Sequence, residues 1–527
     1  MFRSQKCLFC LLLYSSTSVV KIQKPIYTAN AKFLTLFSIC FIALLWKMTL
    51  NSTHSFLQHS FWHKIITDIR FWIVLFFILR LYGITNAPLE IGHNWRQSLT
   101  NMIARNFLET DNKILYPRID MDGNKTGIIG SEFPLFNYLI YLTSKVFGYA
   151  HWYGRLINLL VSSIGIFYFY KTIKRFFTES IAFYASLLLL SSIWFAFSRK
   201  SMPDTFCMSL VIIGIYNGLT YLYDKRITSL LLFAFLSSLA VLCKIPALYL
   251  LSVLAIPLFD KQVAFSFKRN IVLSGVFILI ITYGWYFYWV PYLLATYGFQ
   301  LYFPKEFREG LNELIVYAPK TLEKFYFSAM QSFIGFAAFL AGIYIMIKQK
   351  QTTLAAFFAT ATLFFLLFII KTGFVFSVHN YYVIPFVPVM ALVASFALNE
   401  IKNVKIKIGL VILIMMEGIL NQQHDFRIKD SEKYMLTMES VADKVSDKKD
   451  LFAINGGQSP QQIYFLHRKG WSTDNDSLTD STYIQHLEQK GCKYIFINKK
   501  NANPVIVPKA TEQVVYKDEN FIVYSLK

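Results

Sequence analysis

The residues with the clearest chemical potential lie in short polar segments between long apolar runs. One such segment, 90–97, contains His93, Arg96 and Gln97, and its Asn94 can cap a helix. The apolar positions of that helix recur at helical spacing: Trp95, Leu99, Met102, Ile103 and Phe107. The helix is therefore expected to lie on a membrane surface, and its amino end with Arg96 beside it suits a phosphate group. An interface helix whose Arg96 meets only lipid phosphate is an equal alternative.

Two carboxylates follow in the same polar stretch, Asp120 after Tyr116-Pro117 and Glu132 just before Pro134. Glu132 directly precedes an apolar segment, where loss of solvation would raise its pKa toward that of a useful general base. On composition alone, a loop carboxylate is more often a solvated charge. Arg155 opens the next apolar run and could pair with a phosphate or with one of these acids.

Further polar residues interrupt the apolar runs downstream. Arg199 and Asp204 lie in one such link, and charged groups at membrane depth are usually retained for a partner or a substrate. Pro203 suits a first helical turn that Asp204 would stabilise through the helix dipole, so capping is the alternative role. The remaining candidates are Lys244, His379, Tyr381 and Tyr382. Each is weak evidence alone, because lysines snorkel and tyrosines form aromatic belts.

The composition is that of an integral membrane protein. Hydrophobic residues make up 55% of 527 residues and aromatic residues 17%, and the mean hydropathy is +0.43. The net charge of +21 does not indicate nucleic acid, because lysine and arginine fall mostly in short connections, with anionic membrane lipids as neighbours. The six cysteines are scattered, and the Cys7-Cys10 pair has no second pair, so neither a disulfide framework nor a zinc site is predicted.

Apolar runs near the roughly 20 residues that a crossing needs predict about eleven transmembrane helices. They lie near 69–85, 154–172, 178–197, 203–223, 228–243, 246–260, 271–291, 326–347, 353–370, 381–398 and 405–420. Basic residues mark every second connection, which places all candidate residues on the outer, non-cytoplasmic side. The apolar segment Phe133 to Phe147 is expected to lie at the outer interface, because a crossing there would invert every later basic loop.

Both ends of the chain differ from this pattern. Residues 1–68 form an extension of uncertain topology: two further crossings (thirteen in all), one crossing, a cleaved signal peptide, or a true start at Met48 all stay open. Residues 425–527 are polar and predict a small soluble α/β domain on the outer side. Its expected strands are 451–454, 494–497, 513–516 and 521–524, with helices near 459–467 and 480–490.

The order of short motifs resembles a known family. HNWRQ, YPRID, SEFPL, GRL, SRxxMPD and HNYY, followed by Pro385 and Pro388, are similar to bacterial membrane glycosyltransferases of family 39 over about residues 70–400. Relatives include protein O-mannosyltransferases and the lipid A aminoarabinose transferase. The resemblance implies a mainly α, C-type glycosyltransferase fold in residues 69–424, with a long first outer loop at 86–153. It also implies an inner-membrane location, a cavity open to the periplasm and a polyprenyl-phosphate-sugar donor.

The family also implies roles for individual residues. An acid of the first outer loop activates the acceptor, and basic residues hold the carrier phosphate. The usual Asp-Glu pair is absent at HNWRQ, and Leu99 stands where relatives often carry Asp, so Asp120 and Glu132 are the candidate bases. The candidates for binding phosphate or substrate are His93, Arg96, Gln97, Arg155, Arg199, Lys244, His379, Tyr381 and Tyr382. Asp204 is expected to orient Arg199 or the sugar hydroxyls.

The predicted function is inverting transfer of a sugar to a glycolipid, glycan or protein acceptor. No cofactor is required, because guanidinium and ammonium groups can hold the phosphate, although the carboxylates leave room for a divalent metal. The alternative is a transporter or flippase of a lipid-linked substrate, which would need neither a long first outer loop nor the C-terminal domain. The sequence does not identify the sugar or the acceptor.

Overall fold

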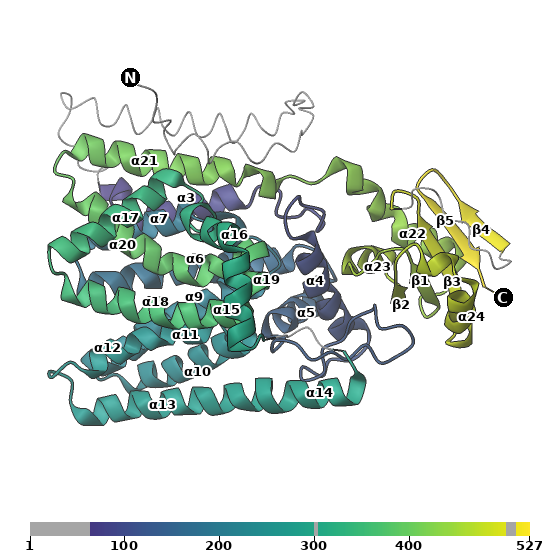
Figure 1. Ribbon diagram of the computed structural model, residues 1–527, viewed down its shortest axis with the longest axis horizontal. Helices are drawn as coiled ribbons and strands as arrows, with labels where there is room; N and C mark the ends of the chain where they lie inside the picture. Colours follow the sequence, from purple (N-terminus) through teal and green to yellow (C-terminus); the bar gives the residue numbers. More distant parts are fainter. Residues whose placement is uncertain (1–63, 300–303, 502–512, 527) are drawn as a thin grey trace, which may run out of the picture. The chain divides into compact units, whose positions relative to one another are not determined.

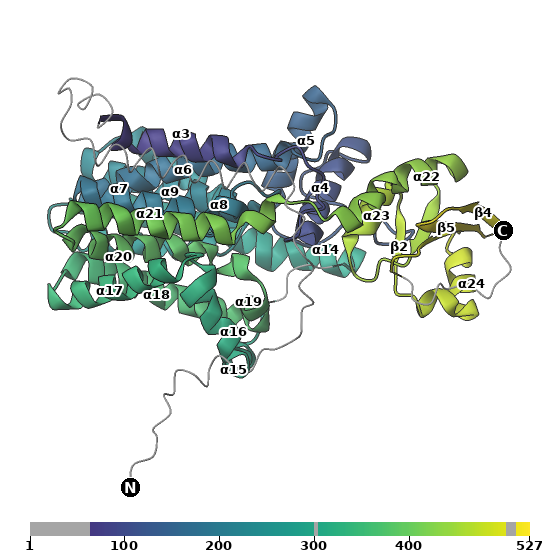
Figure 2. The same ribbon diagram turned by 90° about the horizontal axis from the view of Figure 1, so that it is seen from above.

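Apolar helices account for most of the chain before residue 424. The computed structural model describes residues 64–299, 304–501 and 513–526, which all belong to one compact unit. Its long helices run side by side (Figures 1 and 2). Within this part, a helix lies in each of the eleven ranges that the apolar runs predict: α3 (Ile69–Arg80), α6 (Tyr153–Phe176), α7 (Glu179–Ser191), α9 (Pro203–Asp224), α10 (Ile227–Cys243), α11 (Ala247–Leu251) with α12 (Ala255–Leu258), α13 (Phe265–Tyr283), α17 (Phe333–Lys348), α18 (Thr352–Thr372), α20 (Val387–Glu400) and α21 (Val404–Asn421).

Short helices connect these elements. They are α8 (Trp194–Phe197), α14 (Val290–Tyr297), α15 (Phe307–Val316), α16 (Ala318–Glu323), α19 (Phe374–Val378), and the 3-10 or π segments η1 (Ser252–Leu254), η2 (Gly284–Trp289), η3 (Lys324–Ser328), η4 (Asn380–Phe386), η5 (Gln423–Phe426), η6 (Asp430–Thr437) and η7 (Ser477–Thr479). The predictions for residues 1–63, including those on Cys7, Cys10 and Met48, lie outside the described residues.

The chain is a membrane protein. Five of the described helices are long and apolar enough to cross a bilayer, or six if a bent pair is one span. The other predicted crossings coincide with shorter or more polar helices, so the total of eleven or thirteen stays a prediction. The run predicted at 326–347 is not one straight helix: the axis bends by 92° and α17 begins only at Phe333. Ser332 caps that new helix start, and Glu417 accepts hydrogen bonds from its first amides.

Two helices of the long connection between α3 and α6, α4 (Asn94–Glu109) and α5 (Leu135–Phe147), pack against each other. Asn94 does not cap α4 as predicted. The capping position belongs to His93, whose φ is 61°, and the Asn94 amide donates to Glu432 instead. The apolar face of α4 does not lie on a membrane surface either, because Leu99, Met102, Ile103 and Phe107 are buried in a protein core with residues of the C-terminal region. Whether α5 lies at the membrane interface stays a prediction.

That C-terminal region contains a five-stranded mixed sheet in the order β2-β1-β3-β5-β4. The strands are β1 (Leu451–Ile454), β2 (Gly470–Ser472), β3 (Cys492–Asn498), β4 (Gln513–Lys517) and β5 (Phe521–Ser525). β1 pairs in parallel with β2 and β3, whereas β5 pairs antiparallel with β3 and β4. The sequence predicts four of these strands, as well as helices α23 (Pro460–Leu466) and α24 (Ser481–Gln489), and misses β2 and α22 (Met438–Val445).

The two faces of the sheet are covered differently. One face, with Ala453, Ile495 and Ile522, packs against residues of α24. The other face, with Phe452 and Phe496, shares a core with residues of α22, α23 and α4. Helix α4 is thus held between α5 and the C-terminal region, and its amino end carries Arg96.

Candidate active site

The first part of the site is an ion pair between the first turn of α4 and the segment that precedes α5. Arg96 lies in the first turn of α4, and its Nη2 donates to both carboxylate oxygens of Glu132 at 2.8 Å. The side chains are mostly buried, with 17% of Arg96 and 25% of Glu132 exposed. Burial alone would raise the pKa of Glu132, but the charges of Arg96 and Lys244 outweigh it and lower the pKa below its ordinary value. The predicted upward shift is therefore wrong, and Glu132 is ionised at neutral pH.

A second ion pair joins the end of α10 to the start of α9. Lys244 directly follows α10, and its ammonium donates to Oδ1 of Asp204 in the first turn of α9. Pro203 opens α9 as predicted. The other carboxylate oxygen of Asp204 is buried without a hydrogen-bond partner in the part of the chain that the structure describes. The partner of Asp204 is thus Lys244 and not Arg199, so that part of the prediction is wrong; a role toward sugar hydroxyls stays a prediction.

Aromatic rings from η4 cover this second pair. The Lys244 ammonium lies 5.1 Å from the ring centroid of Tyr381 and 5.6 Å from that of Tyr382, within range of cation–π attraction. His379 stacks on Tyr381 at 5.2 Å, and His93 meets the same ring edge-on at 5.3 Å. We call Arg96, Glu132, Lys244 and Asp204, with these rings, the cavity cluster.

Both histidines beside the cavity cluster are largely neutral at pH 7. Burial and the nearby Lys200 lower the pKa of His93 to about 4, and its Nε2 lies 2.9 Å from Oδ1 of Asn380. Burial, followed by the charge of Lys324, also lowers the pKa of His379. His379 is therefore poorly suited to the predicted role of a cation that holds phosphate.

Three members of the cavity cluster, Glu132, Lys244 and Tyr382, line a large cavity, whereas Arg96, Asp204, Tyr381 and the two histidines do not line it themselves. The cavity has a volume of about 890 Å³, and Glu132, Lys244 and Tyr382 contribute to its wall together with Lys371 and Thr372. The rest of the wall is mostly apolar and comes mainly from α11, η1, α12, α13 and α18; it includes Leu248, Leu251, Leu254, Ile271, Val276, Leu279, Phe364 and Leu367. The wall of the cavity thus combines a large apolar part with a few charged and polar side chains.

Three predicted residues belong to a different, fully closed group. Arg155 and Arg199 are 0% exposed and both point at Glu90, with Nη1–Oε1 distances of 3.4 Å and 2.9 Å. Gln97 bridges the group, because its Nε2 donates to Glu90 and its Oε1 accepts from Nε of Arg155. We call this group the Glu90 cluster. None of its residues lines the cavity, so the predicted phosphate-binding roles of Gln97, Arg155 and Arg199 gain no support from this geometry.

Sequence reasoning missed Glu90 itself, although this residue opens the polar segment 90–97. Its carboxylate is completely buried, between Leu89 and Ile91 in the chain. The sequence did contain a signal for it, because two arginines at membrane depth need a buried acid as their counterion. A neighbouring pair was missed for the same reason: Lys200 donates to Asp425 at 2.6 Å and to the carbonyl of Gly92 at 2.9 Å.

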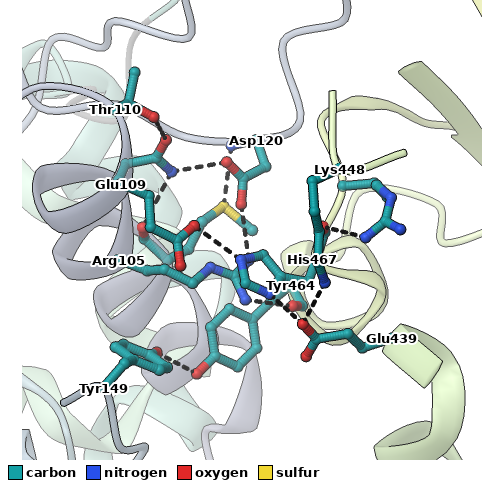
Figure 3. Close-up of polar contacts among 12 residues, drawn as sticks. Arg105, Glu109, Thr110, Asp120, Tyr149, Glu439, Lys448, Tyr464 and His467 are labelled. Atoms are coloured by element: carbon teal, nitrogen blue, oxygen red, sulfur yellow. Dashed lines mark hydrogen bonds and ion pairs between the residues drawn. The ribbon is translucent and has the colours of Figure 1, made fainter. Parts of the chain in front are cut away.

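The second candidate base, Asp120, lies away from the cavity, at the contact between α4 and the C-terminal region (Figure 3). Its carboxylate accepts hydrogen bonds from Arg105 at 3.0 Å and from Asn106 at 2.7 Å. Arg105 also donates to the carbonyl of Tyr464 in α23 and lies 4.7 Å above the tyrosine ring. The structure therefore does not bring Asp120 together with Glu132.

A histidine bridge completes this contact (Figure 3). Nε2 of His467 lies 2.8 Å from Glu109 at the end of α4, and Nδ1 lies 2.6 Å from Glu439 in α22. Burial would lower the pKa of His467, but these two carboxylates raise it above its ordinary value. The bridge ties the C-terminal region to the end of α4 opposite to Arg96.

The described residues offer no evident metal centre. Within residues 64–299, 304–501 and 513–526, no three His, Cys, Asp or Glu side chains are grouped to hold a metal ion. The three cysteines described, Cys207, Cys243 and Cys492, are free and buried. The expectation that no cofactor or metal is required stays a prediction.

Comparisons with known proteins agree with the motif resemblance. Residues 131–289 match the family model of dolichyl-phosphate-mannose-protein mannosyltransferases. No curated protein sequence matches the chain significantly. The fold is similar to that of ArnT from Cupriavidus metallidurans in the apo state, with a TM-score of 0.58 and 14% identity over 86% of this chain and 97% of that chain.

Two further structures show the same likeness. ArnT bound to undecaprenyl phosphate gives a TM-score of 0.57 at 14% identity, over 86% of this chain and 98% of that chain. The Archaeoglobus fulgidus oligosaccharyltransferase in complex with zinc and sulfate gives 0.52 at 11% identity, over 81% of this chain and 68% of that chain. At such identities the likeness shows the fold alone, which this chain shares with ArnT and with the oligosaccharyltransferase. The resemblance predicted from the motifs is thereby confirmed.

Proposed function

We propose that this protein transfers a sugar from a polyprenyl-phosphate-linked donor to a glycolipid, glycan or protein acceptor on the periplasmic side of a bacterial inner membrane. The observation that carries the proposal is the cavity of about 890 Å³, whose mostly apolar wall also carries the polar side chains of Glu132, Lys244 and Tyr382. A polyprenyl phosphate has the same division, because a long hydrocarbon chain carries one anionic head. The similarity of the fold to a protein solved with undecaprenyl phosphate supports this ligand class.

The proposed reaction is an inverting displacement. An acceptor oxygen or nitrogen attacks the anomeric carbon, the bond from that carbon to the phosphate oxygen breaks, and polyprenyl phosphate leaves with the electron pair. Glu132 accepts the acceptor's proton. Lys244 and Arg96 stabilise the negative charge that grows on the phosphate, so catalysis rests on positioning and electrostatics.

The geometry supports Glu132 over Asp120 as the base. Glu132 lines the cavity and is ionised at neutral pH, so it can accept a proton. Asp120 is occupied by Arg105 and Asn106 at the contact with α23. Asp204 has one buried carboxylate oxygen without a partner and could accept a hydrogen bond from a sugar hydroxyl.

Turnover by the purified full chain tests the proposal. The protein in detergent would receive undecaprenyl-phosphate-linked hexoses, with membranes from a strain lacking the gene as the acceptor source. We expect release of undecaprenyl phosphate, and a loss of about 10²-fold or more in Glu132→Gln. Glu179→Gln is the matched control, because Glu179 is an exposed carboxylate bound to Lys174 in a different part of the fold.

Other outcomes would redirect the proposal. Full activity in Glu132→Gln together with loss in Asp120→Asn would move the base role to Asp120. Movement of a labelled polyprenyl-phosphate sugar across a liposome membrane, with the sugar bond intact and no turnover under any condition, would favour a flippase instead. Activity that EDTA abolishes and a divalent cation restores would contradict the absence of a metal requirement.

A further inference from the structure

The charges at the cavity end cancel one another almost completely. Arg96 is paired with Glu132, and Lys244 is paired with Asp204. The two ion pairs of the cavity cluster therefore contribute no net charge for an anionic ligand.

Lys371 is the exception among the described residues that line the cavity. It lies in the last turn of α18 and contributes to the cavity wall together with Glu132, Lys244 and Tyr382. Its ammonium has no carboxylate within 4 Å in the described part of the chain. The nearby carboxylates are already engaged, because Lys305 binds Glu309 at 2.6 Å and Glu313 at 3.1 Å.

The backbone around Lys371 is held in place, although its side chain has no polar partner among the described residues. The carbonyl of Lys371 accepts a hydrogen bond from the amide of Lys305 at 2.9 Å. Two residues further on, Gly373 has a φ of +58°, and the next amide, that of Phe374, donates to Glu313 at 2.7 Å. Elements α15 and α19 thus fix the end of α18, so the lysine stem starts from a defined point on the cavity wall.

We propose that Lys371 binds the phosphate of the lipid carrier, as the uncompensated cation of a cavity whose other charges are paired. This inference rests on the proposed function and names a residue that the motifs do not include. The alternative is a lysine that only snorkels to the membrane surface. That alternative would not depend on the charge of a ligand in the cavity.

The chemistry of the reaction sharpens the proposal. The donor is a phosphodiester with one negative charge, whereas the released carrier is a phosphomonoester with a charge of about −1.5 to −2 at pH 7. A cation without a counterion therefore favours the released carrier over the donor. Loss of Lys371 should weaken binding of undecaprenyl phosphate more strongly than it raises KM for the sugar donor.

The test compares Lys371→Gln, Lys371→Arg and the control Lys320→Gln in the full-length protein in nanodiscs. Lys320 is an exposed lysine of α16 that does not line the cavity. The probes are undecaprenyl phosphate, uncharged undecaprenol and inorganic phosphate. We expect the Kd for undecaprenyl phosphate to rise about tenfold in Lys371→Gln and less than about threefold in Lys371→Arg, with no change in Lys320→Gln.

The other probes distinguish the possible failures. Undecaprenol should bind equally to all variants, and inorganic phosphate should not displace the lipid, because the apolar body supplies much of the affinity. An unchanged Kd in Lys371→Gln, with turnover still dependent on Glu132, would overturn the role of Lys371 and leave the proposed function intact. A wild-type protein that binds undecaprenol as tightly as undecaprenyl phosphate would overturn both proposals.

Discussion

The Glu90 cluster and the cavity cluster are built from the same residue types and differ in how completely their polar atoms are used. Arg199 donates to Glu90 and to the carbonyls of Arg80 and Tyr82, and no part of its side chain is exposed. In the cavity cluster, Arg96 donates to Glu132 alone among the described residues, and one oxygen of Asp204 has no partner. The comparison shows that the presence of arginine or aspartate does not by itself indicate a ligand site. Polar atoms near a cavity that lack a protein partner do indicate one.

The largest expected effect is on stability, from a change in the Glu90 cluster. Glu90→Ala would leave Arg155 and Arg199 buried without their carboxylate, which costs about 3–5 kcal/mol for a broken buried pair. We expect little folded protein and a strongly lowered apparent melting temperature in detergent. Glu179→Ala, which removes an exposed carboxylate, is the control. A Glu90→Ala protein with a normal melting temperature and reduced turnover would reverse the comparison and place the Glu90 cluster in the active site.

The next effect is on turnover, from a change in the cavity cluster. Lys244→Met keeps most of the side-chain volume but removes the charge, and we expect kcat/KM to fall about 10²- to 10³-fold, as for loss of one oxyanion-stabilising group. Melting should change less than in Glu90→Ala, because Lys244→Met leaves one buried group, Asp204, without its partner, whereas Glu90→Ala leaves two arginines without theirs. Steady-state kinetics and thermal unfolding of the same preparation check both. Equal losses of stability in the two variants would remove the distinction between the clusters.

A smaller loss of stability is expected from a change of Asp120, which belongs to neither cluster. Asp120→Asn keeps a side-chain oxygen for Asn106 but loses the charge next to Arg105, which should cost about 1–2 kcal/mol of stability. Turnover per folded molecule should stay within about threefold of wild type. Measured activity would be normalised to the folded fraction. A pH profile of kcat/KM that loses its acidic limb in this variant would show Asp120 to be the base after all.

The smallest effect concerns pH and the His467 bridge. Because Glu109 and Glu439 raise the pKa of His467, the bridge stabilises the protein fully below the unfolded histidine pKa of about 6.5. This contribution is lost as the pH rises through the folded, higher pKa. The carboxylates are more than 40% exposed, so the gain is below about 1 kcal/mol.

Melting temperatures between pH 6 and pH 9 check this pH dependence. We expect the wild type to lose about 1–2 °C more than His467→Gln over this range. The hydrogen bond to His467 is the main cause that lowers the pKa of Glu439, to about 2. Titration of Glu439 therefore affects stability only in acid, and it does not contribute to the difference between wild type and His467→Gln from pH 6 to pH 9. A variant with the same pH slope as wild type would show that the bridge is uncharged in the folded state.

The apolar pattern predicts most of the fold because a long apolar run in a membrane protein forms a helix. Helices lie in all eleven expected ranges, and the strands β1, β3, β4 and β5 coincide with their predicted positions to within two residues. β2 was missed because Gly470–Ser472 is only three residues long and shows no alternation. The break before α17 was missed because hydropathy does not register a bend at residues 329–332.

The site was harder to predict because its chemistry depends on partners distant in sequence. The sequence analysis selects Glu132, Lys244 and Tyr382, which do line one cavity. They do not reveal that Glu90 neutralises Arg155 and Arg199, or that Arg96 lowers the pKa of Glu132. Lys371 looks like any basic residue at the end of a membrane helix, and only the pairing of its neighbours distinguishes it.

The core shared by α4 and the C-terminal sheet has a consequence for biogenesis. Arg105 and Tyr464, which meet in this core, are separated by 359 positions, so the helix that carries Arg96 is synthesised long before its packing partners. The apolar side of α4 must remain uncovered while most membrane helices are inserted, and chains that are exposed in this way are prone to misassembly. Nascent chains that stop before residue 435 should therefore hold α4 in a protease-sensitive form, which becomes protected only after the final strands leave the ribosome and translocon.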